Sequence, residues 1–574
     1  MLAHIKINNF EYVEDNSQTI LQVAAKHGIK IPTLCYIKKE ECNFEHKPAS
    51  CRVCIVEVKG RNNLLPACST YIADKMEIYT NNIRVRAERK AVLELMLSNH
   101  PNDCLTCAKS DRCSLQALAA ELGIKRRKYV GPLSQPNEEL VYGSIVRNPS
   151  KCILCTRCSD LCDKVQSIGA ITPSERGFRT IISEPVDCVN CGQCVQVCPT
   201  GALMQVDDTR IVDRELNDPD KYVIVNTAPS VRVSLGEPFG LEPGTDVTGK
   251  MITALRMLGF KKVFDTNFGA DLTIMEEATE LLERLKEGKK LPIITSCCPG
   301  WIKFIETQYP ELLDLPSSCK SPQEMFGAMA KTYFAKQEGI DPKKIVNVSL
   351  MPCIAKKQEL ARDEEKFDGL QGTDYSLSVK EFAMMLKRYG IDLVTLPDSE
   401  FDSPLGKSTG AADIFGHTGG VMEAALRSAA YFLKCEPPVI EFHGVIGKKN
   451  TKEALVQLDD VTLHVCVVSG LANARIVLDE LKAGKSNYDA IEIMACPGGC
   501  VNGGGQFVHK HRSNADVIKG RTQGLKEIDK SKSIRISAEN EEIIALYDNF
   551  LEKPGSKLAH HLLHTSYKDC KNEE

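Results

Sequence analysis

Residues 152–162 read CILCTRCSDLC, and residues 188–199 read CVNCGQCVQVCP. Both stretches contain the spacing C-x2-C-x2-C-x3-C, which is the one clear internal repeat of the chain. The second stretch ends in Pro199, the proline that usually follows this pattern, whereas Asp163 follows the first stretch. Eight cysteines at two identical spacings do not arise by chance, so we interpret them as ligands of metal clusters.

The repeat is the pattern of bacterial two-cluster ferredoxins, in which the fourth cysteine of each run binds the other cluster. It therefore predicts two 4Fe–4S clusters with exchanged fourth ligands. The first cluster would be held by Cys152, Cys155, Cys158 and Cys198. The second cluster would be held by Cys188, Cys191, Cys194 and Cys162.

The composition indicates a soluble protein with reduced thiols. The net charge of −4 over 574 residues lacks the basic excess expected of a nucleic-acid-binding protein. No apolar run reaches 18 residues, and the N-terminus lacks the apolar core of a signal peptide, so we expect no membrane association and a cytoplasmic location. Of the 25 cysteines, 16 lie before residue 200. In a reducing compartment, such groups of cysteines are typical of metal sites rather than disulfides.

The N-terminal residues predict a small ferredoxin-like domain. Residues 1–14 alternate as a β-hairpin does, and Ser17 is expected to cap a short helix. A hairpin, a helix and a cysteine-rich loop suggest a β-grasp fold, on which four thiolates suit a 2Fe–2S cluster. The predicted ligands are Cys35, Cys51, Cys54 and Cys68. Cys42 is a rival ligand within the same loop, and a zinc site or free thiols are the alternatives to a cluster.

A second cysteine group follows, within residues 88–122, which are otherwise helical in pattern. Its members are His100, Cys104, Cys107 and Cys113. Alone, this set could bind zinc, or the histidine could simply end a helix. The set is similar to the one histidine and three cysteines that follow the ferredoxin domain of the large iron–sulfur subunit of complex I, where they bind 4Fe–4S. The long gap between Cys35 and Cys51 resembles the same subunit.

The chain changes character after a linker-like stretch at residues 131–150. From about residue 208, short apolar runs alternate with helical stretches, which predicts an α/β region large enough for two lobes. Three of its predicted strands are followed at once by cysteines, in TSCCPGW at 295–301, MPCIAKK at 351–357 and MACPGGC at 494–500. Because ligands bind beyond the carboxyl ends of strands in open α/β folds, we expect these three loops to converge on one site. The nearby glycines, Gly498, Gly499 and Gly503–Gly505, would let the backbone approach a bulky ligand.

These three segments closely resemble the signature motifs of FeFe-hydrogenases, and the resemblance covers nearly the whole chain. The order of the modules is similar to that of the large monomeric members with four accessory clusters. The resemblance implies a multidomain α+β and α/β fold with four parts. They are a β-grasp ferredoxin-like domain (1–82), a His-ligated 4Fe–4S domain (83–131), a two-cluster ferredoxin-like domain (132–207) and a two-lobed α/β catalytic domain (208–574).

The resemblance also implies an H-cluster, a 4Fe–4S cubane joined through one cysteine to a two-iron unit with CO, cyanide and azadithiolate. By position in the motifs, the cubane ligands would be Cys298, Cys353, Cys496 and Cys500, of which Cys500 bridges to the two-iron unit. Lys356 would hydrogen-bond one cyanide, and Pro229 and Ser230 would lie near the other. Gln323, Met351, Phe415 and Met494 would line the pocket.

Cys297, next to a predicted ligand, then has a different role. The resemblance implies that it exchanges protons with the azadithiolate amine, and a thiol with an ordinary pKa of ~8.5 suits that role. From Cys297 the family's proton relay would run through Glu277, Ser317, Glu280 and Arg284. The three charged residues share one face of a predicted helix, at spacings of three and four. The alternative is a solvated acidic helix.

The implied reaction is the reversible reduction of protons to dihydrogen by a ferredoxin hydrogenase, an oxidoreductase of anaerobic hydrogen metabolism. Ferredoxin or flavodoxin would exchange electrons with a monomer, and maturation proteins would install the two-iron unit. The nearest alternative is the catalytic subunit of an electron-bifurcating complex. Three other classes of protein fit less well. An electron-transfer subunit of an NADH-oxidising complex does not explain the three late motifs. An iron–sulfur assembly factor does not explain the N-terminal domains, and a hydrogen sensor does not explain Cys297. His417 is expected to be packed or partly exposed rather than to tune the site.

Overall fold

The computed structural model describes residues 1–110, 112–509 and 512–571. Its N-terminal sheet has the strand order β2-β1-β7-β5-β6, and α1 lies beside it. The predicted hairpin is confirmed, because β1 and β2 pair antiparallel around Asn8 and Asn9, both at positive φ. The elements of this region are β1 (Leu2–Ile7), β2 (Phe10–Asp15), α1 (Ile20–Lys26), β3 (Ile37–Lys39), β4 (Phe44–His46), β5 (Ile55–Val58), β6 (Leu65–Pro66) and β7 (Glu77–Tyr79).

The predicted cap of α1 is wrong. Thr19, not Ser17, is the N-cap, and it forms a capping box with Gln22. The backbone N–H of Ser17 instead donates to the Asp15 carboxylate in the turn before the helix. A threonine followed three residues later by glutamine satisfies two free N–H groups at once, so the helix starts there.

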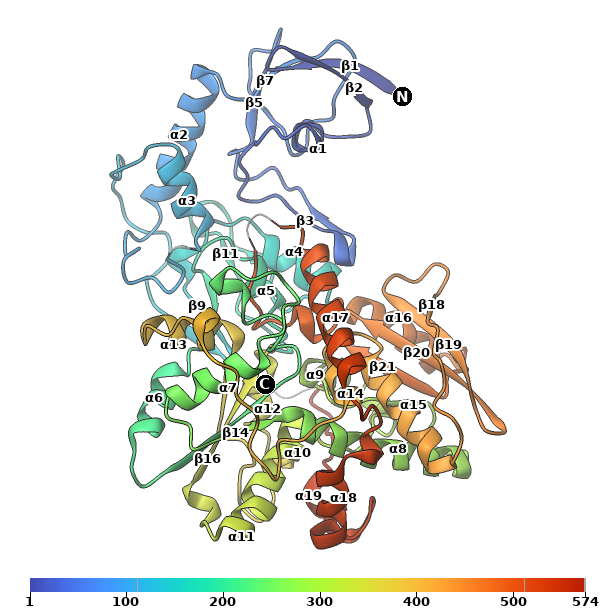
Figure 1. Ribbon diagram of the computed structural model, residues 1–574. Coiled ribbons are helices and arrows are strands. Elements are labelled where there is room, and N and C mark those ends of the chain that lie inside the picture. The colour runs from blue at the N-terminus through green and yellow to red at the C-terminus, as the bar shows by residue number, and fades with distance from the viewer. Residues whose placement is uncertain (111, 510–511, 572–574) are drawn as a thin grey trace.

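The middle of the chain is made of small elements around the cysteine motifs. Residues 131–150 are not wholly a linker, because β8 and β9 form a hairpin there with Gly143 at positive φ, and β12 pairs with β9. Figure 1 shows α4 and α5 between the N-terminal sheet and the large α/β region. The elements are α2 (Ile83–Ser98), α3 (Ser114–Glu121), β8 (Leu140–Tyr142), β9 (Ile145–Arg147), α4 (Arg157–Lys164), β10 (Pro173–Ser174), β11 (Ile181–Ile182), α5 (Gln193–Val197) and β12 (Leu203–Gln205).

The α/β region contains two sheets. The first has the order β14-β13-β16-β17, and all its pairs are parallel. Its strands are β13 (Tyr222–Thr227), β14 (Lys262–Asp265), β16 (Ile345–Met351) and β17 (Tyr375–Ser378). The helices around it are α6 (Thr209–Asn217), α7 (Thr248–Met257), α8 (Thr266–Glu287), α10 (Pro322–Met329), α11 (Ala335–Glu338), α12 (Ala355–Glu359) and α13 (Val379–Arg388).

The second sheet has the order β15-β21-β20-β19-β18, parallel among the first three strands and antiparallel beyond. Its strands are β15 (Ile293–Ile294), β18 (His443–Gly444), β19 (Thr451–Leu458), β20 (Val461–Ser469) and β21 (Ala490–Met494). The remaining helices are α9 (Pro299–Gln308), α14 (Gly410–Asp413), α15 (Gly420–Leu433), α16 (Leu471–Lys482), α17 (Asn514–Ser531), α18 (Glu541–Leu546) and α19 (Lys557–Leu563).

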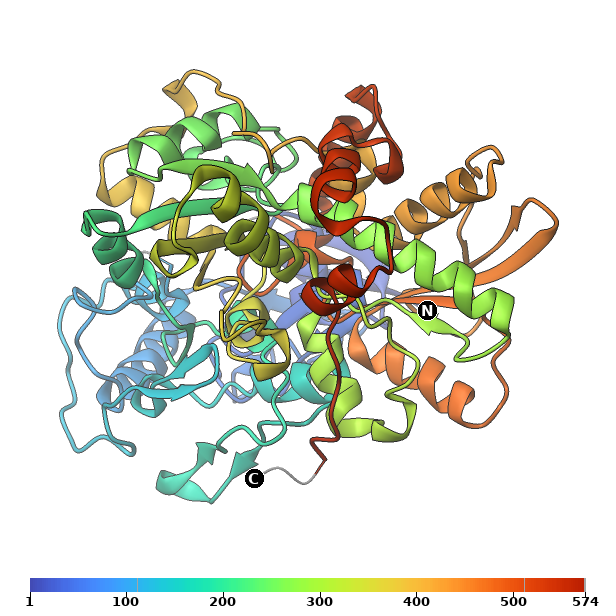
Figure 2. The same cartoon turned by 90° about the horizontal axis from the view of Figure 1, so that it is seen from below.

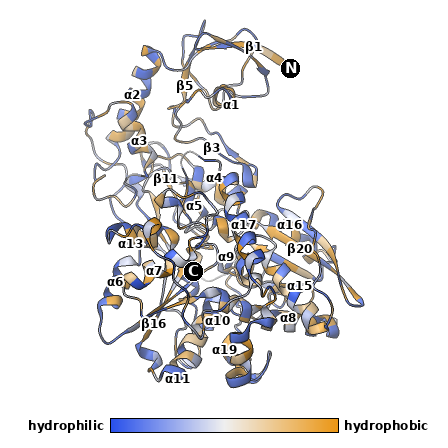
Figure 3. Cartoon of the chain, viewed as in Figure 1, coloured by the Kyte–Doolittle hydropathy of each residue, from blue (hydrophilic) through white to orange (hydrophobic). Residues whose placement is uncertain are grey.

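Each sheet carries its own apolar core, as the orange strands β16 and β20 show in Figure 3. Helix α8 connects the two cores. Its 22 residues make it about 33 Å long at the usual helical rise. It contacts α10 beside the first sheet and α15 beside the second, and Figure 2 shows it extending from one to the other. The carboxylates of this helix therefore lie along the line between the two sheets. The predicted domain boundaries stay predictions.

Candidate active site

Three loops from both sheets bring four cysteines together, of which Cys496 is buried and the other three are half-buried. Cys298 follows β15 and is the N-cap of α9, and Cys353 lies between β16 and α12. Cys496 and Cys500 follow β21. Burial raises the pKa of all four thiols, and neighbouring thiolates raise those of Cys353, Cys496 and Cys500 further. The thiols can lose their protons together only when a cation compensates the charge, which suits a metal cluster.

The glycines after Cys496 serve a purpose that the sequence did not predict. A Cβ on Gly503 would lie 2.3 Å from the carbonyl oxygen of Pro352, and one on Gly504 would lie 2.6 Å from that of Cys191. A Cβ on Gly499, whose φ is +96°, would lie 2.8 Å from the backbone N of Thr418 and 2.9 Å from Met494 Sδ. These glycines therefore let the loops approach one another, which holds the four thiols in place.

Several polar atoms around the thiols are buried without a hydrogen-bond partner among the described residues. They are Ser230 Oγ, His417 Nε2, Thr418 Oγ1, Gln506 Oε1 and Glu277 Oε1. Gln506 Nε2 donates to the carbonyl oxygens of both Ser230 and Cys500, and Gly499, next to Cys500, lies against the backbone of His417 and Thr418. Unpaired buried atoms are costly, so these atoms near Cys500 point to a polar ligand. Pro229, beside Ser230, is buried.

The remaining predicted pocket residues lie in two groups. Lys356 Nζ donates to the carbonyl oxygen of Cys297 at 3.3 Å and to Glu359 Oε2 at 2.7 Å. Gln323 also donates to Glu359 Oε2, at 3.1 Å, and accepts from Ser349 Oγ at 2.7 Å. The second group is apolar: Phe415 and Met494 belong to one buried cluster, and Cys297 packs against it. Met351 instead belongs to the core of the first sheet.

Cys297 lies next to a carboxyl group on α8. Burial raises the pKa of Cys297 well above its ordinary value, and Glu277 raises it further. The expected ordinary pKa of this thiol is therefore wrong for the buried position. Burial, together with Glu280 and Glu492, raises the pKa of Glu277 to about 8. Glu277 can therefore hold a proton near neutral pH and release it on a small change in its surroundings.

The outer part of the predicted relay forms a connected group. Ser317 Oγ donates to Glu280 Oε2 at 2.8 Å, and Arg284 pairs with Glu280 one helical turn away. Arg284 also donates to the carbonyl oxygens of Leu315 and Pro316. The side chain of Glu280 is 16% exposed, and the residue Glu277 is 4% exposed. The relay residues therefore run from a buried end beside Cys297 to an end that solvent reaches.

The cysteines of the repeat form two groups with exchanged fourth members, as the pattern predicts. Each group lines a small cavity of its own. One cavity is lined by Cys152, Cys155, Cys158 and Cys198. The other is lined by Cys162, Cys188, Cys191 and Cys194. Their assignment as cluster ligands stays a prediction.

The first cysteine set also comes together. The thiol of Cys35 interacts with those of Cys51 and Cys68, and Cys54 interacts with Cys68. Cys42 instead packs beside Phe44 and Leu161. The structure therefore separates the rival Cys42 from the other four.

In the second set, thiolates of Cys104 and Cys107 add to the burial that raises the pKa of Cys113. His100 is buried, and its Nδ1 bonds to the carbonyl oxygen of Pro101 at 2.8 Å. Its Nε2 has no partner among the described residues, as a nitrogen reserved for a metal would.

The cysteine groups are linked in space. Arg157 is half-buried and lies between two of them, since thiolates of both Cys155 and Cys35 oppose the lowering of its pKa by burial. Lys109 lies in the same way near Cys198 and Cys113. The first and the second cysteine sets therefore form two arms that both adjoin the repeat group containing Cys155 and Cys198. The second group adjoins the buried site, since Cys191 interacts with both Cys353 and Cys496.

Comparisons with known proteins agree with this arrangement. The family described as "Iron only hydrogenase large subunit, C-terminal domain" matches residues 221–504, and "Iron hydrogenase small subunit" matches 515–570. The chain is 50% identical over 563 residues to NADP-reducing hydrogenase subunit HndD of Solidesulfovibrio fructosivorans, covering 96% of each. It is 41% identical over 579 residues to iron hydrogenase 1 of Clostridium pasteurianum, covering 98% of this chain and 99% of that one.

The chain belongs to the FeFe-hydrogenases. A solved structure of a variant of [FeFe]-hydrogenase HydA1 from Chlamydomonas reinhardtii is 40% identical to this hydrogenase. The two share a TM-score of 0.58 over 63% of this chain and 99% of that one. The predicted family and enzyme class are thereby confirmed.

The N-terminal third matches three further families. They are "2Fe-2S iron-sulfur cluster binding domain" at 3–83, "NADH-ubiquinone oxidoreductase-G iron-sulfur binding region" at 89–128 and "4Fe-4S dicluster domain" at 151–202. The hydrogenase therefore combines iron–sulfur domains of the 2Fe–2S and 4Fe–4S types with a catalytic domain. Among the described residues, no helix has the length and apolarity needed to cross a membrane.

The residues of this hydrogenase fit the H-cluster of its family. Four thiols lie on three loops from the two sheets, and Ser230 Oγ and His417 Nε2, which lack a partner among the described residues, belong to residues beside Gln506 and Gly499 near Cys500. His417 is buried, not partly exposed, and burial lowers its pKa to about 4, so the imidazole is neutral. The predicted packing of His417 is correct.

Sequence reasoning missed a buried carboxyl group behind the site. Glu492 lies on β21 and accepts from the backbone N–H groups of Gly419 and Met422 at 2.6 and 2.9 Å. Burial raises its pKa to about 7, and its charge contributes to the raised pKa of Glu277. A glutamate inside the apolar run IEIM was a signal that could have revealed it.

Proposed function

We propose that this hydrogenase reversibly reduces protons to dihydrogen with electrons from reduced ferredoxin or flavodoxin. One observation carries the proposal. The group of four thiols interacts with Cys191 of the cluster repeat and with Cys297, which in turn interacts with Glu277. A site that adjoins both an electron-carrying and a proton-carrying group suits a reaction that consumes both.

In this proposal, Cys298, Cys353, Cys496 and Cys500 would hold the H-cluster, and Cys500 would be the ligand nearest its two-iron unit. When bound, the H-cluster supplies the metal centre at which two protons and two electrons combine. Lys356 and Ser230 offer hydrogen bonds to polar ligands of that centre, and Gln323 fixes Glu359, which in turn holds Lys356. Phe415 and Met494 exclude water from the thiol of Cys297.

The proton path is made of this chain's own side chains. Arg284 keeps Glu280 oriented at the solvent side, where Glu280 takes up a proton and exchanges it with Ser317 Oγ. Glu277 holds the proton at its carboxyl group, which its raised pKa favours. Cys297 holds and releases the proton at Sγ at the inner end. Because Cys297 is not among the four thiols assigned as ligands, its sulfur keeps a proton to give.

Electrons would pass through one 2Fe–2S and three 4Fe–4S accessory clusters. The two sets before residue 120 form arms that lead to the group around Cys155 and Cys198, and the group around Cys191 completes the path. Two arms offer two docking points for an electron-carrying protein. The proposal keeps the chain a monomer that maturation proteins supply with the two-iron unit.

Hydrogen evolution from a reduced viologen tests the proposal. Anaerobically purified protein, made together with the maturation proteins, should evolve hydrogen. Cys297→Ser should lose about 100-fold or more of the rate, since a positioned acid–base group contributes that much. Cys435→Ala, a half-buried thiol outside the site, should keep the parental rate. Equal rates for Cys297→Ser and the parent would contradict the assigned role of the thiol.

A second candidate is the catalytic subunit of a larger, electron-bifurcating complex. The observation that favours it is the 50% identity over 96% of the chain to a subunit named as NADP-reducing. Purification from the native cells under anaerobic conditions separates the two candidates. A flavin-containing subunit that copurifies and couples hydrogen to NADP would replace ferredoxin as the direct partner. Fast hydrogen evolution with reduced ferredoxin by the isolated chain would favour the monomer.

A further inference from the structure

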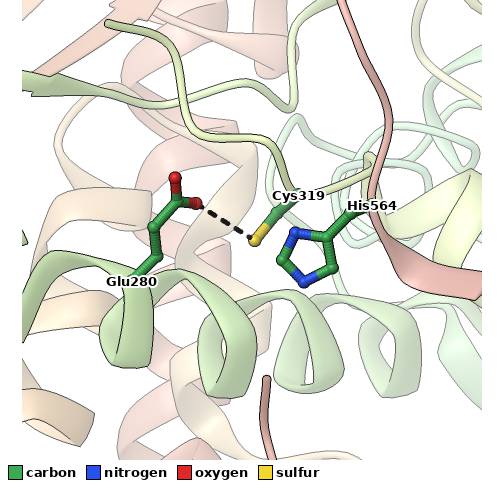
Figure 4. A group of neighbouring side chains, drawn as sticks. All are labelled: Glu280, Cys319 and His564. Atoms are coloured by element: carbon green, nitrogen blue, oxygen red, sulfur yellow. Dashed lines mark hydrogen bonds between the residues drawn. The ribbon is translucent and has the colours of Figure 1, made fainter. Parts of the chain in front are cut away.

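Three side chains meet at the outer part of the proton path, and two of them, Cys319 and His564, have no part in the proposed reaction. Cys319, Glu280 and His564 each offer one ligand atom, and these atoms lie within 4.8 Å of one another. Figure 4 shows Cys319 Sγ between the Glu280 carboxylate and a ring nitrogen of His564. The thiol of Cys319 donates to Glu280 Oε2 at 3.8 Å.

We propose that Cys319, His564 and Glu280 form a zinc site through which Zn²⁺ inhibits the enzyme by occupying the proton relay. This inference rests on the proposed function, in which Glu280 carries protons. A thiolate, an imidazole and a carboxylate are the three ligand types that bind zinc in proteins. Three protein ligands with one position left for water are a common arrangement for this ion.

The backbone fixes two of the ligands next to each other. Cys319 and His564 are partners in an antiparallel bridge, with hydrogen bonds from Lys320 N to Leu563 O and from Thr565 N to Ser318 O, both of 2.8 Å. Such partners bring their Cβ atoms to about 5 Å. Zinc holds its ligand atoms roughly 3.5 Å apart, so side-chain rotations suffice to close the site.

The ring of His564 is oriented as in many zinc sites. Its Nε2 bonds to Glu276 Oε2 at 3.1 Å, and Glu276 is itself held by Tyr547 and by the backbone N–H of Gly555. Zinc-binding histidines typically donate their second N–H to a carboxylate in this way. Nδ1 then faces Ser318 Oγ at 2.8 Å and would exchange this hydrogen bond for the metal.

The ion would reach the site and would stop the relay there. The side chain of Glu280 is 16% exposed, whereas Cys319 is fully buried, so Glu280 lies at the entrance. Zinc binding would release the Cys319 proton to solvent and bind Glu280 Oε2, the oxygen that accepts from Ser317 at 2.8 Å. Proton uptake would stop, whereas electron transfer through the accessory clusters would be unaffected.

X-ray absorption at the zinc edge, with one equivalent of Zn²⁺ added to the cluster-loaded enzyme, tests the site directly. We expect one sulfur ligand at about 2.3 Å with nitrogen and oxygen ligands. Cys319→Ala should lose this sulfur, and the matched control Cys435→Ala should keep it. Zinc without a sulfur ligand in the parent, or with an unchanged sulfur ligand in Cys319→Ala, would overturn the site regardless of activity.

Inhibition tests the consequence. Zn²⁺ should lower both viologen-driven hydrogen evolution and exchange between D₂ and water, and Cys319→Ala should raise the half-inhibiting concentration about 10-fold or more. The same half-inhibiting concentration in both proteins would overturn the inhibitory role. Loss of evolution with intact exchange would do so too, since it would place zinc on the electron path. An enzyme that is inactive without zinc would count against the proposed function alone, because the absorption result stands separately.

Discussion

The cluster-bearing N-terminal third and the α8 region supply the same site in different ways. In the first, the groups that matter are close in sequence, as in the cysteine runs of the repeat, and the proposed function assigns them to iron–sulfur clusters. In the second, Cys297, Ser317 and the α8 carboxylates come from separate segments, and the proposed function assigns them to proton transfer, with burial raising the pKa of Glu277. A change in one region should therefore disturb one current and spare the other.

Replacing Glu277 by glutamine should slow the enzyme more than any single change in the N-terminal third. Glu277→Gln keeps the shape of the side chain but cannot carry a proton, so hydrogen evolution should fall by about 100-fold. The matched control is Glu283→Gln, an exposed position on the same helix, which should keep the parental rate. Infrared bands of iron-bound CO and cyanide should be unchanged in both variants. A Glu277→Gln enzyme with the parental rate would remove Glu277 from the relay.

A change in the N-terminal third should have a smaller and more selective effect. Cys104→Ala removes an exposed member of the second cysteine set and one predicted cluster. Evolution driven by ferredoxin should fall several-fold, whereas exchange between D₂ and water should stay near the parental rate. Iron analysis should show the loss of one cluster. Unchanged iron content would show that the set holds no cluster.

The last effect concerns the pH dependence of stability. The pKa of Glu277 is raised from 4.5 to about 8, so between these values the folded protein binds more protons than the unfolded chain. Glu277 therefore lowers the free energy of unfolding as pH rises through this range, by at most about 1.4 kcal/mol per pH unit. Glu277→Gln should remove this decline, so its melting temperature should gain on the parent from pH 5 to pH 8. A constant difference across that range would mean that Glu277 is ionised throughout.

The two regions also differ in how far the sequence predicts them. The cysteine groups of the repeat were predictable because their spacing is local and fixed by one loop and one helical turn. The shared face of Glu277, Glu280 and Arg284 was predictable for the same reason, since helical spacing alone places them.

Contacts between distant segments were not predictable from the residues. His564 lies far along the chain from Cys319 and belongs to no motif, so only the folded chain brings them together. The cap at Thr19 and the hairpin of β8 and β9 depend on competing local hydrogen bonds and on pairing with β12. The role of Gly503 and Gly504 depends on which loops meet them.

Exchange between D₂ and water tests the central claim most directly, because it needs protons at the site but no external electron donor. It should be measured on Cys297→Ser and Cys104→Ala beside the parent, with infrared bands confirming the two-iron unit in each. The account predicts that Cys297→Ser loses exchange and that Cys104→Ala keeps it. Exchange at the parental rate in Cys297→Ser would contradict the separation of a proton-carrying α8 region from an electron-carrying N-terminal third.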